Sequence, residues 1–92
     1  MEIVRVQILD EDKLERKHNV LQHEVFEVMH SRPRIRFSER GKSSGEDVYA
    51  AYGRTESGRY LVLFFIYKST RVALVISARD MDDKERRAYA RK

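Results

Sequence analysis

The stretch RYLVLFFIYKSTRVALVISARDM, residues 59–81, decides the fold of this chain. Residues 60–67 are continuously apolar and rich in aromatic and β-branched side chains, and residues 71–78 form a second β-branched run. Both compositions are typical of strands, and Lys68-Ser69-Thr70 fits a short turn between them. A strand that is apolar on both faces cannot meet water on either side. We therefore expect residues 60–67 to lie in the centre of a sheet.

Alternation along these two strands predicts which side chains share a face. One face of the first strand would carry Leu61, Leu63, Phe65 and Tyr67, and the other Tyr60, Val62, Phe64 and Ile66. Each set needs cover, and an uncovered apolar face implies a partner or a homodimer formed through the sheet. In the second strand the same alternation groups Arg71, Val75, Ser77 and Arg79 on a partly wet face.

Upstream of this hairpin, periodicity predicts one short strand and two helices. Residues 2–8 alternate as a strand. Residues 10–18 begin with acidic and end with basic side chains, as the helix dipole favours, and Asn19 suits the left-handed conformation that ends a helix. Residues 21–30 form a second helix, stopped by Pro33. Its apolar stripe consists of Leu21, Val25, Val28 and Met29.

The remaining segments complete an α+β pattern. Residues 33–40 and 47–54 are predicted strands around a flexible loop, and residues 82–92 are a predicted helix. Loops of about three to seven residues between the strands from Arg34 onward are too short for parallel crossovers. We expect a single domain, residues 1–92: two N-terminal helices and one C-terminal helix packed on an antiparallel sheet of about four strands, with a short extra N-terminal strand.

Composition excludes several function classes. The 92 residues contain no cysteine, which excludes thiol nucleophiles and thiolate zinc sites and is consistent with a reducing cytoplasm. No signal peptide is recognisable, and no apolar run reaches the ~18 residues of a membrane span. The formal net charge of +4 favours nucleic acid or an acidic protein as the partner.

Arginines supply the main candidate binding groups. Arg34 and Arg36 point to the same side of a strand, ~6.6 Å apart, a spacing suited to successive backbone phosphates. The alternative is an edge strand whose positive charge prevents sheet-to-sheet association. A second group stands near strand ends, where guanidinium groups suit phosphate binding and stabilisation of a charged transition state. It consists of Arg54, Arg59, Arg71 and Arg79. The alternative is surface ion pairing with Glu46, Asp47, Asp80 or Glu85.

Histidines give no metal-site pattern. His23 and His30 are too far apart on one helix to chelate a single ion, and no metal-binding motif occurs, so we expect no metal site. His18 is a candidate general base, because an imidazole can take up and release a proton near neutral pH. A histidine at a helix end also commonly interacts with the terminal carbonyls.

Several sequence blocks occur together in one order. They are RKHNV (16–20), EVFEVM (24–29), GEDVYAAYGRT (45–55), GRYLVLFFIY (58–67) and VISARDMDDKERRAY (75–89). In these blocks, and in total length, the chain resembles the BrnT family of toxins from type II toxin–antitoxin systems. The family usually has glycine where Asn19 stands, and a serine or threonine helix cap where Leu21 stands.

The resemblance implies a fold like that of RelE-type ribonucleases and no metal or cofactor. It implies a ribbon-helix-helix, BrnA-like antitoxin as partner, with operator DNA bound only through the antitoxin. It also implies metal-independent cleavage of mRNA, free or at the ribosome, by attack of a ribose 2′-hydroxyl on the adjacent phosphate. The alternative is a non-catalytic module that binds an antitoxin or nucleic acid.

Roles follow for particular residues if the resemblance holds. Arg54 and Arg79 would hold the scissile phosphate, and Lys17 and His18 match a lysine–histidine pair of the family. His18 or Glu46 would be the base, Tyr89 would stack on a base or donate a proton, and Glu85 would orient Arg79. Further RNA contacts are expected from Arg34, Arg36, Arg59, Arg71 and Arg86.

Overall fold

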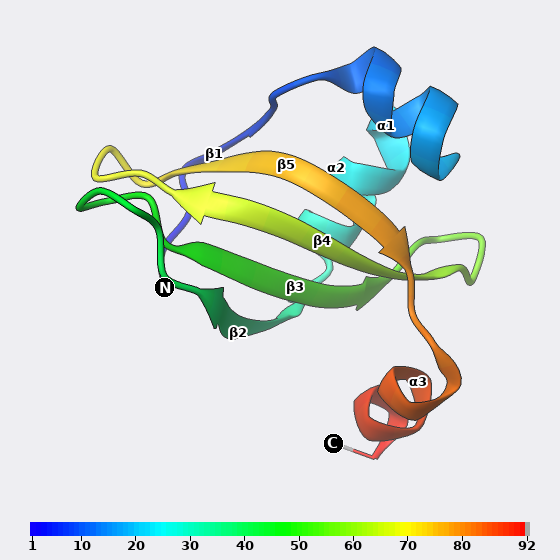
Figure 1. Ribbon diagram of the computed structural model, residues 1–92. Coiled ribbons are helices and arrows are strands. Elements are labelled where there is room, and N and C mark those ends of the chain that lie inside the picture. Colours follow the sequence, from blue (N-terminus) through cyan, green and yellow to red (C-terminus); the bar gives the residue numbers. More distant parts are fainter. Residues whose placement is uncertain (92) are drawn as a thin grey trace.

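The computed structural model describes residues 1–91. Its elements are β1 (Arg5–Ile8), α1 (Glu11–His18), α2 (Gln22–His30), β2 (Arg34–Glu39), β3 (Val48–Arg54), β4 (Tyr60–Tyr67), β5 (Val72–Asp80) and α3 (Asp83–Ala90). The expected α+β class is confirmed (Figure 1). The last helix was expected to span residues 82–92; α3 is capped by Asp82 and ends at Ala90, and Lys92 lies outside the described residues.

The sheet is mixed and has five strands in the order β1-β5-β4-β3-β2. Strands β2 to β5 form the expected antiparallel meander. The N-terminal strand is not a separate extra: β1 pairs in parallel with β5, from Arg5 opposite Val72 to Ile8 opposite Val75. Short loops constrain only strands that follow each other in the chain. They therefore could not predict where β1 would pair.

One face of the sheet, here the helical face, is covered by α1 and α2 (Figure 1). Leu61, Leu63 and Phe65 of β4 are fully buried there. They pack in one core with Leu14, Val20, Val25 and Val28 of the helical segment. Helix α2 crosses β3 at Gly53, where an added Cβ atom would lie 2.8 Å from Cγ1 of Val28. The absence of a side chain at Gly53 therefore lets helix and strand approach closely.

The other face, here the open face, is covered less completely. Val62 is buried, but Tyr60, Phe64 and Ile66 are only partly buried. A smaller cluster packs against Val62 on this side, and it consists of Ala50, Met81, Tyr52, Tyr60, Phe64 and Tyr89. Helix α3 has no buried residue and lies beyond the end of β5, apart from α1 and α2 (Figure 1). The two faces of β4 are thus unequal, although its sequence is apolar on both.

A β-bulge corrects the predicted faces of β5. Phe64 pairs with Ser77, whereas Phe65 pairs with Val75, so β5 has one extra residue at this point. The extra residue shifts the alternation. Val75 therefore lies on the helical face, and its predicted grouping with Ser77 and Arg79 is wrong. Arg71 does not belong to that group either, because it precedes β5 with a positive φ of 67°.

The helix ends show how the sequence compensates for unusual residues. Asn19 adopts the expected left-handed conformation, with φ 55° and ψ 38°. Leu21 offers α2 no side-chain cap, but the Glu24 carboxylate accepts a hydrogen bond from the Leu21 N–H at 3.0 Å. One of the free N–H groups at this helix start is thereby satisfied.

No helix in residues 1–91 is long and apolar enough to cross a membrane.

Candidate functional site

Strand pairing gathers arginines on the open face. Residues directly opposite each other in neighbouring strands point to the same face. Tyr52 pairs with Arg34 on one side and Val62 on the other, and Val62 pairs with Arg79. By the same register, Arg36 and Arg54 share this face through Ala50 and Tyr60. Three strands therefore contribute the guanidinium groups of Arg34, Arg36, Arg54 and Arg79.

Aromatic rings lie between these arginines. The guanidinium carbons of Arg54 and Arg86 lie 5.0 Å and 4.5 Å from the Tyr60 ring centroid. Tyr89 of α3 meets Tyr60 edge-on, with ring centroids 6.0 Å apart. Arg34 stands 5.9 Å from the Tyr89 ring. The open face thus combines positive charge with partly exposed ring surface, a combination suited to binding single-stranded nucleic acid.

Arg79 is fixed by Glu85. Its two terminal nitrogens donate to the Glu85 carboxylate at 2.7 Å and 2.9 Å. This hydrogen-bonded pair lowers the pKa of Glu85 and raises that of Arg79, against partial desolvation of both groups. Glu85 also accepts from the Asp82 N–H at 3.0 Å, and Asp82 accepts from the Glu85 N–H at 2.7 Å. One carboxylate therefore caps α3 and holds Arg79 in place. Orientation of Arg79 is the role expected for Glu85 from the sequence.

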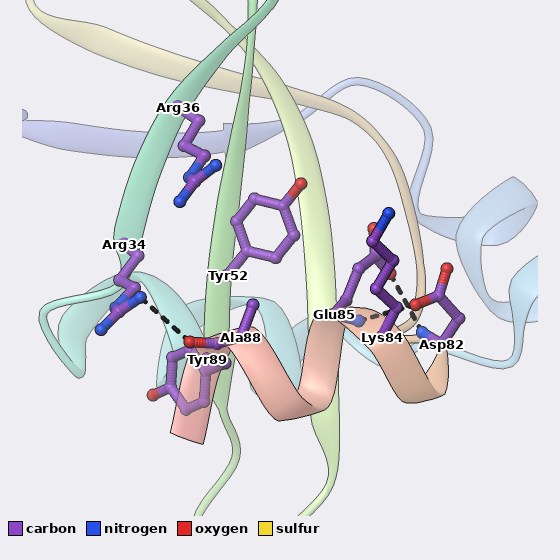
Figure 2. A pocket seen from close by; sticks show the side chains of 8 residues that line it. All are labelled: Arg34, Arg36, Tyr52, Asp82, Lys84, Glu85, Ala88 and Tyr89. Atoms are coloured by element: carbon purple, nitrogen blue, oxygen red, sulfur yellow. Dashed lines mark hydrogen bonds between the residues drawn. The ribbon is translucent and has the colours of Figure 1, made fainter. Parts of the chain in front are cut away.

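A cavity of about 330 Å³ lies between β2, β3 and α3 (Figure 2). Its lining consists of Arg34, Arg36, Tyr52, Asp82, Lys84, Glu85, Ala88 and Tyr89. Figure 2 shows Tyr52 extending from β3 between the two arginines of β2 and Glu85 of α3. Arg34 donates to the Ala88 carbonyl at 3.3 Å, which ties β2 to the end of α3.

Two aromatic residues of this face, Tyr52 and Tyr60, were not among the predicted site residues. Their signal was present in the sequence. Tyr52 is two residues before Arg54 in β3, so the two side chains point to the same face, and Tyr60 pairs with Arg54 across the β3–β4 turn. From the sequence, Tyr60 was expected only as part of the apolar central strand.

Arg59 lies on the helical side of the sheet and is fully engaged there. It donates to Glu24 at 3.0 Å, to the Asn19 carbonyl at 2.7 Å, and to both oxygens of Asp80 at 2.8 Å and 3.2 Å. Its hydrogen bonds to Asp80 lower the pKa of that carboxyl and raise the pKa of Arg59. Arg59 therefore joins the helical segment to the ends of β4 and β5, and the structure does not bring it to the open face.

Arg71 and Glu46 also lie away from the arginine cluster. Arg71 pairs with Glu2 at 2.6 Å, beside the β4–β5 turn. Glu46 precedes β3 and Arg54 ends it, so the whole length of β3, six residue rises or roughly 20 Å, separates the two. Neither residue can share one phosphate with Arg54 and Arg79.

Lys17 and His18 end α1, over the helical face. The hydrogen bonds of Arg59 to Asn19 and Asp80 connect this helix end to the start of β4 and the end of β5. Asp80 adjoins Arg79 in the chain, but Arg54 and Arg79 lie on the opposite face of the sheet from α1. Within residues 1–91 the side chains of Lys17 and His18 make no hydrogen bond or ion pair. The same part of the chain has no cluster of three His, Asp or Glu side chains that could hold a metal ion.

Comparison with protein families places the chain in relation to a known family. The family model described as ribonuclease toxin, BrnT, of type II toxin-antitoxin system matches residues 10–85. The matched segment runs from the cap of α1 into the first turn of α3 and includes Arg54, Arg79 and Glu85. No curated protein matches the chain.

Proposed function

Since the chain belongs to the BrnT family of ribonuclease toxins of type II toxin–antitoxin systems, we propose that its open face binds and cleaves messenger RNA. The observation that carries this proposal is the interleaving of arginines and tyrosines on one side of a rigid sheet. Guanidinium groups bind phosphates, and tyrosine rings stack on bases without strict sequence preference. Arg54, Arg79 and Arg86 with Tyr60 form the core of this surface.

The proposed reaction is attack by a ribose 2′-oxygen on the adjacent phosphorus. A P–O2′ bond forms, the P–O5′ bond breaks, and the products are a 2′,3′-cyclic phosphate and a 5′-hydroxyl end. Arg79 and Arg54 would neutralise the charge that develops on the phosphoryl oxygens, the largest contribution in many such sites. Glu85 holds the guanidinium of Arg79 in place before substrate arrives, so little reorganisation is needed.

The acid–base groups complete a mechanism that uses side chains alone and no metal ion. We propose His18 as the base, with Lys17 as a neighbouring cation, because hydrogen bonds connect the end of α1 to the end of the sheet that carries Arg54 and Arg79. Glu46, the other sequence-based candidate, stands at the opposite end of β3. Tyr89 would stack on a base or protonate the leaving oxygen.

The family implies an antitoxin partner. We propose a ribbon-helix-helix protein of the BrnA type, through which alone the toxin would reach operator DNA. The half-covered apolar part of the open face, at Phe64, Ile66 and Leu74, is a suitable contact surface for the antitoxin or for a second copy of the chain. We also propose that residues 1–92 form one RelE-like domain acting in the cytoplasm, on mRNA that is free or held by the ribosome.

A second function, RNA or antitoxin binding without cleavage, is favoured by one contact. Glu85 accepts a hydrogen bond from each terminal nitrogen of Arg79 and so competes with a phosphate for this guanidinium group. If the pair does not open, the face binds but does not cleave.

Cleavage of a labelled RNA by the purified chain distinguishes the two functions. We expect 2′,3′-cyclic phosphate products that EDTA does not suppress, and no cut where the attacking ribose is 2′-deoxy. Arg54→Ala and Arg79→Ala should each lower the cleavage rate by about 100-fold or more. Lys13→Ala, which removes the same charge from exposed α1, should leave the rate unchanged. Folded native protein that binds RNA without cutting it would support the non-catalytic function instead.

A further inference from the structure

We propose that the cavity between β2, β3 and α3 is a nucleobase pocket, which holds one base of single-stranded RNA beside the phosphate at Arg79. This inference rests on the proposed function of the same face and adds substrate recognition to it. In this pocket the Tyr52 ring would stack on the base, and Arg36 would lie at the opening.

The size of the cavity fits a single base. Its volume of about 330 Å³ lies at the small end of ligand pockets, which span roughly 300–1,000 Å³. A cavity of this size admits one planar heterocycle and leaves the sugar and phosphates outside. The Tyr52 ring from β3 and the Ala88 and Tyr89 side chains from α3 supply its less polar walls.

The lining carries charges of both signs, and the two carboxylates on its α3 side favour a base over a phosphate at that side. Glu85 and Asp82 form the α3 side of the cavity, and two carboxylates repel a phosphate group. Carboxylate oxygens can accept hydrogen bonds from the amino groups of a base. Arg36, Lys84 and Arg79 stand around this acidic wall, where they can bind the phosphates on either side of the enclosed nucleotide.

The two arginines of β2 differ in their contacts: Arg34 binds α3, and Arg36 is free to bind a ligand. Arg34 donates to the Ala88 carbonyl and lies over the Tyr89 ring, so it holds α3 against β2 and keeps the cavity closed on that side. The side chain of Arg36 forms no hydrogen bond, ion pair or ring contact with any of residues 1–91, and the residue is exposed. An exposed guanidinium at the mouth of a small cavity is free to meet an incoming nucleotide.

Small probes test the pocket with the native protein. The probes are the four nucleoside 3′,5′-bisphosphates and an abasic sugar bisphosphate, which carries the same phosphates without a base. Binding is followed by amide chemical shifts in ¹⁵N-labelled protein. We expect the nucleoside probes to shift the Tyr52, Lys84 and Ala88 amides. They should bind about 5- to 150-fold tighter than the abasic sugar, the range expected for one stacked base.

Two variants of Tyr52 test whether stacking causes the preference for nucleoside over abasic probes. Tyr52→Ala should abolish the difference between the nucleoside and abasic probes, whereas Tyr52→Phe, which keeps the ring, should retain it. Arg36→Ala should weaken all probes alike, and Arg40→Ala, on the same chain segment beyond β2, should not. Equal affinity of abasic and nucleoside probes for the native protein, or shifts confined to amides away from the cavity, would overturn the proposal.

The cleavage assay separates this inference from the proposed function. Native protein that cuts RNA but does not discriminate the abasic probe would leave the ribonuclease function standing and remove the pocket. Native protein that prefers nucleoside probes through Tyr52 but cuts no RNA would support the pocket and leave a non-catalytic RNA-binding face.

Discussion

At the scale of single residues, hydrogen-bond partners divide the arginines by role. Arg59 and Arg79 both bind a carboxylate through two nitrogens. Arg59 additionally reaches Glu24 and the Asn19 carbonyl, and its side chain is only 23% exposed. Arg79 is 44% exposed on the open face. The first arginine therefore connects helices to sheet, and the second presents charge to a ligand.

Arg59→Ala should destabilise the folded chain by about 2 kcal/mol. The substitution removes several charge-assisted hydrogen bonds, each worth roughly 1.5–3 kcal/mol when buried, and solvent at Asp80 screens part of the loss. It also leaves the Glu24 carboxylate, which is largely buried, without its cation. Urea denaturation followed by circular dichroism measures the change.

Lys13→Ala is the control for Arg59→Ala, since it removes a positive charge with no tertiary partner. A loss below about 0.5 kcal/mol for Arg59→Ala, within the range of ordinary surface substitutions, would show that the helical segment does not depend on this contact.

At the scale of elements, α3 depends on polar contacts because it buries no residue. Glu85 connects it to β5 through Arg79, Arg34 connects it to β2, and Tyr89 meets Tyr60. Helices with few buried apolar contacts open locally at low free-energy cost. The charge of one carboxylate, Glu85, therefore contributes to holding α3, and with it the cavity, in position.

Acid should release α3 before the rest of the fold. The Arg79 hydrogen bonds hold the pKa of Glu85 below its ordinary 4.5, so the pair stabilises the folded state fully above pH about 4.5 and is lost as the pH falls through the lowered pKa. The pKa of Asp80 is lowered by Arg59 in the same sense, from 3.8. We expect Tyr89 amide protection and Tyr60–Tyr89 ring contacts, followed by NMR, to weaken with acidification.

Glu85→Gln provides the matched comparison, because it removes the ionisable group but keeps the shape of the side chain. In this variant the α3 signals should already be weakened at neutral pH and should lose their acid transition. An unchanged transition in Glu85→Gln would assign the acid response to another carboxylate.

The contact between α2 and β3 makes a separate prediction for Gly53. Gly53→Ala would place a methyl group 2.8 Å from Val28 Cγ1, and overpacking of this kind costs about 1–3 kcal/mol. Thermal or urea unfolding should show the loss. Ser44→Ala in the exposed loop serves as the neutral control, and wild-type stability of Gly53→Ala would mean that α2 can shift away from β3 freely.

Sequence patterns predicted the elements well and their pairing only in part. Apolar and β-branched runs located β4 and β5, and caps, charge polarity and an apolar stripe located the helices, because these signals depend on local chain composition and geometry. The bulge that places Val75 on the helical face has no local signal in a run of β-branched residues. The parallel pairing of β1 with β5 depends on contacts between distant segments, which loop lengths do not encode.

At the scale of the whole molecule, tertiary register separates charges that the sequence lists together. Arg54 and Arg59 are close in the chain, yet one joins the open face and the other the helical side. Arg34 and Arg79 are far apart in the chain, yet both flank Tyr52 and Val62. Residue type and spacing could thus predict that arginines bind phosphate, but only the strand order shows which of them act on one ligand.

This distribution predicts a salt dependence of RNA binding that is set by one face. Each phosphate contact with single-stranded RNA contributes about −0.7 to the slope of log affinity against log salt concentration. Arg54→Ala or Arg36→Ala should each make the slope shallower by about that amount, because each removes one contact on the open face. Lys13→Ala on α1 and Arg71→Ala, whose guanidinium pairs with Glu2, should leave the slope unchanged although they remove the same charge.

Fluorescence anisotropy of a labelled 2′-fluoro RNA, which cannot undergo 2′-attack, measures binding without cleavage. Equal changes for all four variants would mean that RNA responds to the net charge of +4 and not to the open face.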